Sequence, residues 1–362
     1  MITETAAQQR SKPTGAAALA LAGRLARAVR GDHLGLLVAL VVLLAFFSYE
    51  SPDFFSKRNL LEILKDVSFT AVIAYGMTFV IVAGEIDISV GSAVGFGSAL
   101  LGWLATKHGW SVWSASAIVL VVGTGIGVGA GIIRATVGVP SFIVTLALFS
   151  ALSGGAFLLT NAIPFSIDDE AFSTIGTGTL AGIPIPAVVM AVAFVVFYAV
   201  ARRTTFGRSV YAIGGNANAA FLSGIPVRRV RILLFATTGA MAALSSLMQS
   251  SQLGAGNPNV GDGLEFSVIA AVIVGGASLA GGSGSMVGTM LGVLFIGVLN
   301  NGMVLIGVNS YAQNVAHGLV VLGAVLLTTV RANRARRATG MRLPGMRHDR
   351  ESRRPPDELK AT

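Results

Sequence analysis

Two acidic residues stand between two long apolar stretches of the sequence. Glu85 and Asp87 belong to the run Gly84-Glu85-Ile86-Asp87-Ile88-Ser89-Val90-Gly91-Ser92. An ionisable side chain within or near a membrane is a candidate for function, because burying it there is costly. The alternative is structural: Asp87 or Ser89 caps the helix that follows by accepting bonds from its free N–H groups. Capping is our interpretation of Asp87, and the role of Glu85 stays open.

Asn300 and Asn301 form a second polar group, near the end of another long apolar stretch. Amide side chains at such a position either join neighbouring helices by hydrogen bonds or line a polar path for a hydroxylated solute. The sequence leaves both readings open. Our candidates for a translocation path or a helix break are therefore Glu85, Asp87, Ser89, Asn300 and Asn301.

The chain lacks the motifs of common hydrolases and nucleotide-binding enzymes. It contains no HExxH or GxSxG sequence, and none of its five lysines stands in a GxxxxGK[ST] loop. It also contains no cysteine, which excludes a thiolate nucleophile and a thiolate metal site. We expect no catalytic residue, no metal site and no cofactor in this chain.

The composition indicates that most of the chain lies in a membrane. Of its 362 residues, 53% are hydrophobic and 12% are charged, and the mean hydropathy is +0.74. Soluble domains carry about 25% charged residues. The net charge of +9 does not indicate a nucleic-acid partner, because the basic residues lie between apolar stretches. That pattern is typical of the cytoplasmic loops of membrane proteins.

Charge-free apolar stretches of roughly 20 residues predict the membrane-crossing helices. The segment 209–227 is long enough, but it is polar, contains glycines and lies between two groups of arginines, so we place 202–231 in the cytoplasm. Both termini are then cytoplasmic, and only Lys57, Arg58, Lys65 and Lys107 of the 26 Lys and Arg residues lie outside. The ten predicted helices are 34–49, 67–84, 88–106, 112–133, 139–160, 184–201, 232–250, 266–280, 285–306 and 311–330.

The predicted fold is an all-α membrane protein in three parts. Residues 1–33 form a cytoplasmic N-terminal tail, residues 34–330 form the transmembrane domain, and residues 331–362 form a basic cytoplasmic tail that we expect to be disordered. In the segment 57–66, leucines alternate with charged residues, which indicates a helix lying on the outer surface of the membrane.

Two stretches of the sequence resemble each other. Residues 80–95 and 272–288 share an apolar end, a glycine, a short break and then Gly-Ser-x-x-Gly entering the next helix. Many transporters contain two structural repeats, so one interpretation is an internal two-fold repeat. The other is that glycine-rich turns between membrane helices have similar compositions.

Three motifs, in order, resemble those of the permease subunits of ribose-type ABC importers. Residues 84–92 resemble the family's GGIDLSVGS signature, and residues 214–225 resemble its cytoplasmic GGNxxAAxLSGI loop. Residues 275–284, followed by Leu299-Asn300-Asn301-Gly302, resemble a third block, and the resemblance covers about residues 34–330. Two departures stand out: Glu85 replaces a commoner glycine, and Asn218 with Phe221 replaces an acidic and a basic residue.

The resemblance implies a multi-pass permease of the cell membrane that is not itself an enzyme. It implies a dimeric pore, made with a second copy or a paralogue, that moves a monosaccharide by alternating access. Separate ATP-binding subunits would dock inside, and a sugar-binding protein would dock outside. The segment 209–227 suits a short coupling helix by its own composition, against the alternative of a solvated loop. The expected contact residues are Gly214, Gly215, Asn216, Ala219, Ala220, Leu222, Ser223 and Gly224.

Two other classes of protein are alternatives. A secondary transporter driven by an ion gradient would use Glu85 or Asp87 as its proton or sodium site and would need no ATPase. A membrane-embedded enzyme would need a nucleophile with its base, or a cluster of metal ligands, and the sequence contains no such motif.

Overall fold

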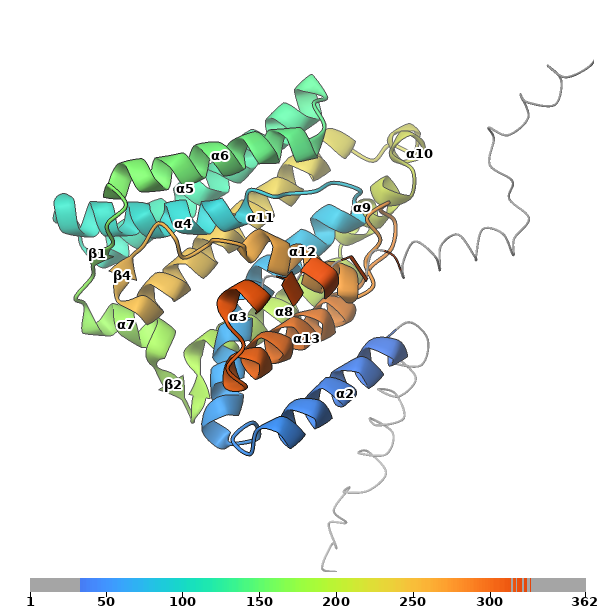
Figure 1. The fold of residues 1–362 in the computed structure, drawn as a ribbon. Helices are drawn as coiled ribbons and strands as arrows, with labels where there is room; N and C mark the ends of the chain where they lie inside the picture. Colours follow the sequence, from blue (N-terminus) through green and yellow to red (C-terminus); the bar gives the residue numbers. More distant parts are fainter. Residues whose placement is uncertain (1–32, 314, 317, 321, 324–325, 327–362) are drawn as a thin grey trace, which may run out of the picture.

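The computed structural model describes residues 33–313, 315–316, 318–320, 322–323 and 326. This part of the chain is a bundle of long helices, with short strands only in the connections at one end (Figure 1). The tails predicted at 1–33 and 331–362 lie outside the described residues, apart from His33.

The helices differ widely in length. They are α2 (Leu34–Glu50), α3 (Lys57–Val82), α4 (Val90–Gly102), α5 (Val112–Ile132), α6 (Ser141–Thr160), α7 (Glu170–Thr177), α8 (Ile185–Arg203), α9 (Thr205–Gly215), α10 (Ala217–Leu222), α11 (Val227–Leu253), α12 (Leu264–Val274) and α13 (Met286–Leu305). Two π-helical turns, η1 (Trp103–Lys107) and η2 (Ile133–Val137), extend α4 and α5. The strands are β1 (Phe165–Ser166), β2 (Thr179–Leu180), β3 (Ile183–Pro184) and β4 (Ala255–Gly256).

Six helices of the described part are long and apolar enough to cross a membrane: α3, α5 with η2, α6, α8, α11 and α13. The prediction of a mostly helical membrane protein is confirmed at this level. The apolar helices α2 and α12 are shorter. The described residues between 310 and 326 are helical, but much of the predicted helix 311–330 lies outside the described part.

The prediction of a separate surface helix at 57–66 is wrong. These residues are the first turns of α3, which runs without interruption from Lys57 to Val82. No glycine or proline occurs before Gly76 to break it. Ser56 caps its start by accepting a hydrogen bond from the backbone N–H of Asn59 (3.2 Å). The charged residues lie in the first turns of this long helix, at its exposed end.

The predicted helix 266–280 is too long at its C-terminal end. α12 ends at Val274, and Gly276 beyond it has a φ of +94°. Only glycine adopts that conformation readily, so the pair Gly275-Gly276 stops the helix. The segment 202–231 is also divided, into α9, α10 and the first turn of α11.

The centre of the bundle is α3, which packs against α8, α11, α12 and α13. Every residue from Ala71 to Val82 is buried. Helices α11 and α5 pack closely over an extensive contact. A Cβ added at Gly123, Gly127 or Gly239 would overlap the facing helix. Small residues allow this approach in lipid, where the hydrophobic effect does not hold helices together.

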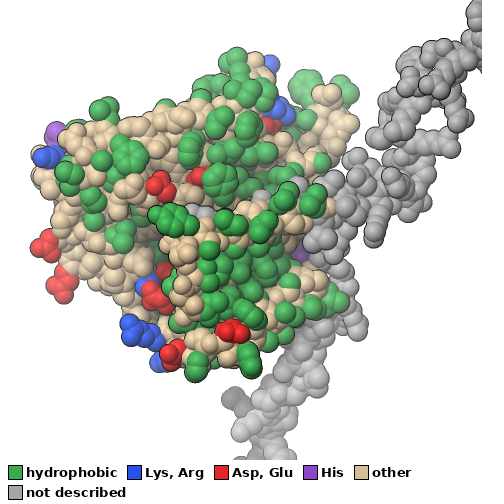
Figure 2. All heavy atoms as spheres, viewed as in Figure 1, with side chains coloured by type: hydrophobic (Ala, Val, Ile, Leu, Met, Phe, Trp, Pro, Cys, Tyr) green, Lys and Arg blue, Asp and Glu red, His purple; other side chains and the backbone are tan. Residues whose placement is uncertain are grey.

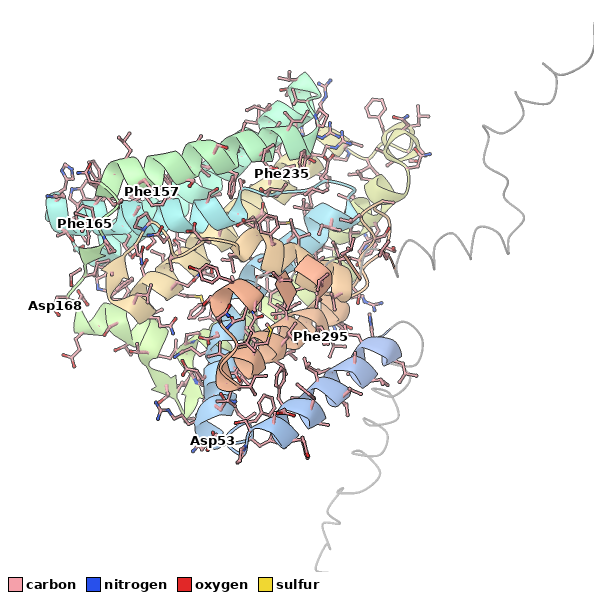
Figure 3. The ribbon with its side chains drawn as sticks, viewed as in Figure 1. Asp53, Phe157, Phe165, Asp168, Phe235 and Phe295 are labelled. Atoms are coloured by element: carbon pink, nitrogen blue, oxygen red, sulfur yellow. The ribbon has the colours of Figure 1, made fainter. Side chains whose placement is uncertain are left out.

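The two ends of the bundle differ. Figure 1 shows α7 and the strands at one end and α9 and α10 at the other. At the first end β1 pairs antiparallel with β4, with Phe165 opposite Gly256, and Figure 3 places Phe165 and Asp168 there. Between the ends, Figure 2 shows a largely hydrophobic surface. Exposed side chains such as Val121, Leu158 and Val195 suit contact with lipid.

Candidate functional site

The motif with the two acids forms an irregular segment, 83–89, between α3 and α4. The turn after α3 is held by hydrogen bonds from the N–H of Gly84 to the carbonyl of Ile81 (2.9 Å) and from the N–H of Glu85 to the carbonyl of Val80 (3.0 Å). Gly84 has a φ of +76°, which glycine tolerates. α4 begins at Val90.

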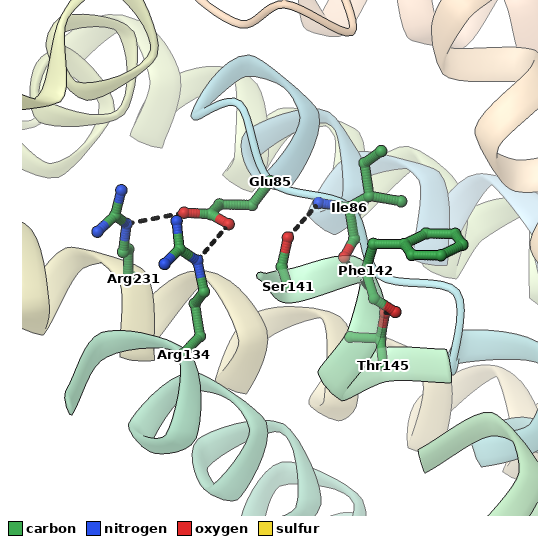
Figure 4. A network of polar contacts seen from close by, with 7 residues as sticks. All are labelled: Glu85, Ile86, Arg134, Ser141, Phe142, Thr145 and Arg231. Atoms are coloured by element: carbon green, nitrogen blue, oxygen red, sulfur yellow. Dashed lines mark hydrogen bonds and ion pairs between the residues drawn. The ribbon is translucent and has the colours of Figure 1, made fainter. Parts of the chain in front are cut away.

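Helix α6 satisfies the backbone of this segment. The N–H of Ile86 donates to Ser141 Oγ (3.1 Å) (Figure 4). The N–H of Ile88 donates to Thr145 Oγ1 (3.2 Å). Irregular backbone persists inside a membrane protein only where such partners replace water. The two hydroxyls therefore fix the path of the segment across the start of α6.

Glu85 is held by two arginines. Its side chain is 2% exposed, with Oε2 2.7 Å from Arg134 Nε and Oε1 2.8 Å from Arg231 Nε (Figure 4). Arg134 belongs to η2 and Arg231 to the start of α11. One buried carboxylate thus joins three elements, and both of its oxygens are engaged.

Asp87 is bound to its own segment and to α11. It accepts hydrogen bonds from Ser89 N (3.1 Å), from Ser89 Oγ (2.6 Å) and from Thr238 Oγ1 (2.7 Å). Ser89 occupies the N-cap position of α4, and its side chain makes no capping bond. Asp87 orders the turn before the helix and does not cap the first turn itself. The interpretation that Asp87 caps α4 is therefore wrong, because its side chain bonds to Ser89 and to Thr238 of α11.

The segment between α12 and α13 begins with the same turn. The N–H of Gly276 donates to the carbonyl of Ile273 (2.9 Å), and the N–H of Ala277 donates to the carbonyl of Val272 (3.1 Å). These spacings of three and five residues equal those after α3. The N–H of Gly282 also donates to the carbonyl of Val82 (2.8 Å), so the two helix breaks are in direct contact.

Helix α9 packs on both breaks. A Cβ added at Gly214 would overlap the carbonyl of Val82 and approach the amide of Gly282. Tyr211 Oη donates a hydrogen bond to the carbonyl of Gly284 (2.9 Å). The predicted contact residue Gly214 therefore faces the bundle, while Gly215 beside it is exposed, with nothing within 4 Å of an added Cβ.

The rest of the predicted contact segment projects from the bundle as α10. Asn216 caps this helix by accepting a hydrogen bond from Ala219 N (3.0 Å). Leu222 is 84% exposed and Phe221 is 68% exposed. The sequence predicted Leu222 as a contact residue, whereas Phe221 was noted only as a departure from the family motif. Of the remaining predicted residues, Ala219, Ser223 and Gly224 are exposed and Ala220 is buried.

Asn301 lies far from the acids. Its side chain exchanges two hydrogen bonds with that of Asn59, at 2.9 and 3.0 Å. Asn59 lies near the start of α3 and Glu85 follows its end, which separates them by roughly 35 Å at the rise of a helix. The interpretation that Asn301 joins helices is the one the geometry favours. Asn300 is half-buried beside it.

The sequence could not pair the acids with their partners. Arg134, Arg231 and Thr238 come from distant elements, and basic residues between apolar stretches indicate cytoplasmic loops rather than partners of a buried acid. Glu265 precedes the predicted helix 266–280, in a connection outside the membrane helices, but it is 2% exposed at the start of α12. Within the described residues, no group of three His, Asp or Glu side chains is placed to hold a metal ion.

Comparison with known families identifies the family of this chain. Residues 59–330 match a family described as the permease component of branched-chain amino acid transport systems. The chain belongs to this permease family. The permease is thus a multi-pass membrane component of a transport system, distinct from the ATPase.

Relatives of the permease have more specific names. The ribose import permease protein RbsC of Haemophilus influenzae is 41% identical over 293 residues, covering 80% of this chain and 90% of the relative. The L-arabinose ABC transporter permease protein AraH of Azospirillum brasilense is 36% identical over 333 residues, covering 91% and 97%. A probable ABC transporter permease protein of Escherichia coli, YphD, is 44% identical over 312 residues, covering 84% and 93%. No solved structure matches the permease significantly.

Proposed function

We propose that this permease carries a monosaccharide into the cell as the membrane subunit of an ATP-driven importer. ATP-binding subunits dock on α10 and the exposed end of α9, and a sugar-binding protein docks at the end of the bundle that carries α7 and the strands. The observation that supports this proposal most is that α9 packs on both helix breaks while α10 presents Phe221 and Leu222 outward. A push on α10 is transmitted to both breaks through one short helix.

The substrate class follows from the relatives. The family description names branched-chain amino acids, but relatives that align over most of this chain are named for ribose, L-arabinose and xylose. At 34 to 41% identity over at least 80% of the chain, a shared class of neutral, hydroxylated solute is the simpler expectation. A monosaccharide is therefore our first choice.

The proposed topology has ten membrane helices with both termini in the cytoplasm. Five exposed arginines lie at the end of the bundle that carries α9 and α10: Arg202, Arg203, Arg208, Arg228 and Arg229. Basic loops face the cytoplasm, so the proposed ATPase contact lies on the side where ATP is available. The described helices α2, α4 and α12 and the predicted helix 311–330 would be the four crossings beyond the six long helices. The pore itself forms with a second copy or a paralogue.

The contacts of Glu85 and Asp87 argue against a transporter driven by an ion gradient. A proton or sodium site needs a carboxyl group that can exchange its partner. Both oxygens of Glu85 are paired with arginines, and Asp87 accepts three hydrogen bonds. These contacts favour fixed structural roles.

The test is co-purification through a tag on this chain, followed by uptake assays in proteoliposomes. We expect an ATP-binding subunit and a binding protein to remain attached, and uptake of D-ribose, L-arabinose or D-xylose to require ATP. Leu222→Asp should release the ATPase, because a charge replaces an apolar side chain at the contact. Leu180→Asp is the matched control for retention of the ATPase alone, because Leu180 is 61% exposed on β2, at the end of the bundle opposite α10. Uptake that persists without the ATPase and collapses with an uncoupler would overturn the proposal.

A further inference from the structure

A segment without helix, 254–263, runs along α4 on one face of the bundle. Three glycines of α4 make room for it, because a Cβ at Gly102 would lie 2.9 Å from Gly256 Cα, one at Gly95 would lie 2.5 Å from the carbonyl oxygen of Pro258, and one at Gly91 would lie 2.7 Å from that of Gly261. The N–H of Asn257 donates to Ser98 Oγ (2.9 Å) between them. Figure 1 shows this connection passing from β4 toward α12 beside α4.

This segment carries the start of α12 deep into the membrane. α4 packs between α6 and α11, both long enough to cross. From Gly102, which contacts β4, to Gly91, which contacts Glu265, the helix rises by roughly 16 Å. The hydrocarbon layer is roughly 30 Å thick. With β4 placed at the edge of that layer, Glu265 lies about halfway through it.

Glu265 has a buried acceptor with no donor. Its side chain is 98% buried against α4, where a Cβ at Gly91 would overlap its Oε2 atom. None of the described residues donates a hydrogen bond to Oε2. An unpaired buried acceptor costs about 1–3 kcal/mol. A group of the transported solute that pairs with it in another conformation would recover that energy.

The side chains around Glu265 are unsuited to lipid. Asp262 and Asn259 are exposed on the surface of this single chain, and lipid-facing positions exclude charged groups at this depth. Figure 2 shows acidic side chains partway along the bundle, on the face that the β4–α12 connection crosses. Phe266, 61% exposed, lies four residues after Asp262, in the first turn of α12. Such a face has to border water or a second copy.

We propose that Glu265, Asp262 and Asn259, with Phe266 beside them, bind the hydroxyl groups and ring of the sugar within the membrane. This inference rests on the proposed function, since it assigns the solute site of that importer. The oxygen atoms accept bonds from sugar hydroxyls, and the aromatic ring covers an apolar face, which is the usual composition of a small-molecule site. Separation of α4 from α12 exposes Oε2, and closure expels the sugar by restoring the contact with Gly91.

The absence of natural cysteine allows a direct test of accessibility. Glu265→Cys and Asp262→Cys are treated with a charged, water-soluble methanethiosulfonate in the assembled importer during ATP hydrolysis. We expect both to be labelled, with labelling lost when saturating D-ribose and the loaded binding protein are present. Val195→Cys, on the lipid-facing side of α8, and Val268→Cys, fully buried on α12, are the controls and should stay unlabelled. No labelling at 262 and 265 in any nucleotide state overturns the inference.

A second measurement separates binding from structure. Glu265→Gln keeps the shape of the side chain and removes the charge. We expect sugar uptake to fall roughly tenfold or more, the factor of one lost hydrogen bond to a charged group, while ATP hydrolysis stimulated by the binding protein is retained. Glu62→Gln, at an exposed site on α3, should change neither. If Glu265→Gln fails to assemble, Asp262→Asn takes its place in the assay.

The outcomes separate the two proposals. Labelling at 262 and 265 without wild-type uptake of D-ribose, L-arabinose or D-xylose contradicts the proposed substrate and leaves the position of the solute site supported. Wild-type uptake that Glu265→Gln and Asp262→Asn both leave unchanged overturns the site and leaves the importer supported.

Discussion

At the level of single residues, Glu85 is the least replaceable side chain of the candidate site. A buried carboxylate pays a large desolvation cost, which only well-placed partners recover. Here the partners are Arg134 and Arg231, whose side chains are each 20% exposed. The guanidinium groups keep part of their hydration while the carboxylate loses nearly all of it. The cluster therefore depends on the carboxylate more than on either arginine.

Glu85→Gln should destabilise the protein by roughly 3–5 kcal/mol, the cost of removing one partner from a buried ion pair. The two arginines would face each other without the intervening charge. Thermal unfolding of the purified protein in detergent measures the effect. Glu62→Gln is the matched control, because Glu62 pairs with Lys65 at 2.6 Å with its side chain 50% exposed, and such pairs contribute about 0–1 kcal/mol. Equal unfolding temperatures for the two variants would contradict this account.

The sequence identified Glu85, Asp87 and Ser89 because charges between apolar stretches are rare. It could not identify Arg231 and Thr238 as their partners. These residues lie about 150 positions further along the chain, and only the packing of α11 beside the break brings them near. Glu265 was missed for a related reason: hydropathy counts an acid beside a loop as external, although the loop itself enters the bundle along the glycines of α4.

At the level of elements, the two helix breaks pack together as one unit. Their turns have the same hydrogen-bond spacing, and Gly282 donates to Val82 across them. The resemblance between residues 80–95 and 272–288 left open whether the two segments form a structural repeat or only share a composition. It did not predict their contact, because the distance between segments so far apart in sequence depends on the whole bundle. Helix α9 belongs to the same unit, since Gly214 contacts both breaks.

Gly214→Ala should weaken the contact of α9 with both breaks and reduce coupled uptake. The added Cβ overlaps the carbonyl of Val82, and backbone on both sides leaves little room to relax, so an overpacking cost of about 1–3 kcal/mol is expected. Gly215→Ala is the control, because an added Cβ there has nothing within 4 Å. Uptake and ATP hydrolysis are measured together for both variants. If both substitutions are tolerated equally, α9 does not transmit motion through this contact.

Helix ends were predictable wherever an apolar run meets a charge or a glycine pair. The predictions for α2, α5, α6, α8 and α13 agree with the structure to within about two residues, the usual uncertainty of helix boundaries. The start of α3 was not predictable in this way, because charged residues at the exposed end of a long helix look like a separate amphipathic helix. α12 was overestimated because the apolar run continues in composition past Val274, while Gly276 takes a positive φ.

At the level of the whole molecule, the bundle has ends of opposite charge. Asp168, Asp169 and Glu170 lie at the end with α7, and exposed arginines surround α9 and α10 at the other. In the proposed topology the basic end faces the cytoplasm, because basic residues tend to stay on that side of a membrane. The same topology would place the proposed ATPase contact at the basic end, since ATP is available in the cytoplasm.

Single cysteines at the two ends test this orientation in intact cells. Asp168→Cys and Asn218→Cys replace exposed residues in a chain without cysteine, so any thiol signal reports one position. A membrane-impermeant maleimide added outside should label position 168 at once, and should label position 218 only after the membrane is permeabilised. Labelling of 218 in intact cells would place α10 outside, where no ATPase could reach it. That result would contradict both the proposed topology and the proposed energy source. Phe221 and Leu222, the exposed apolar side chains of α10, would then lie outside the cell, away from any ATP-binding subunit.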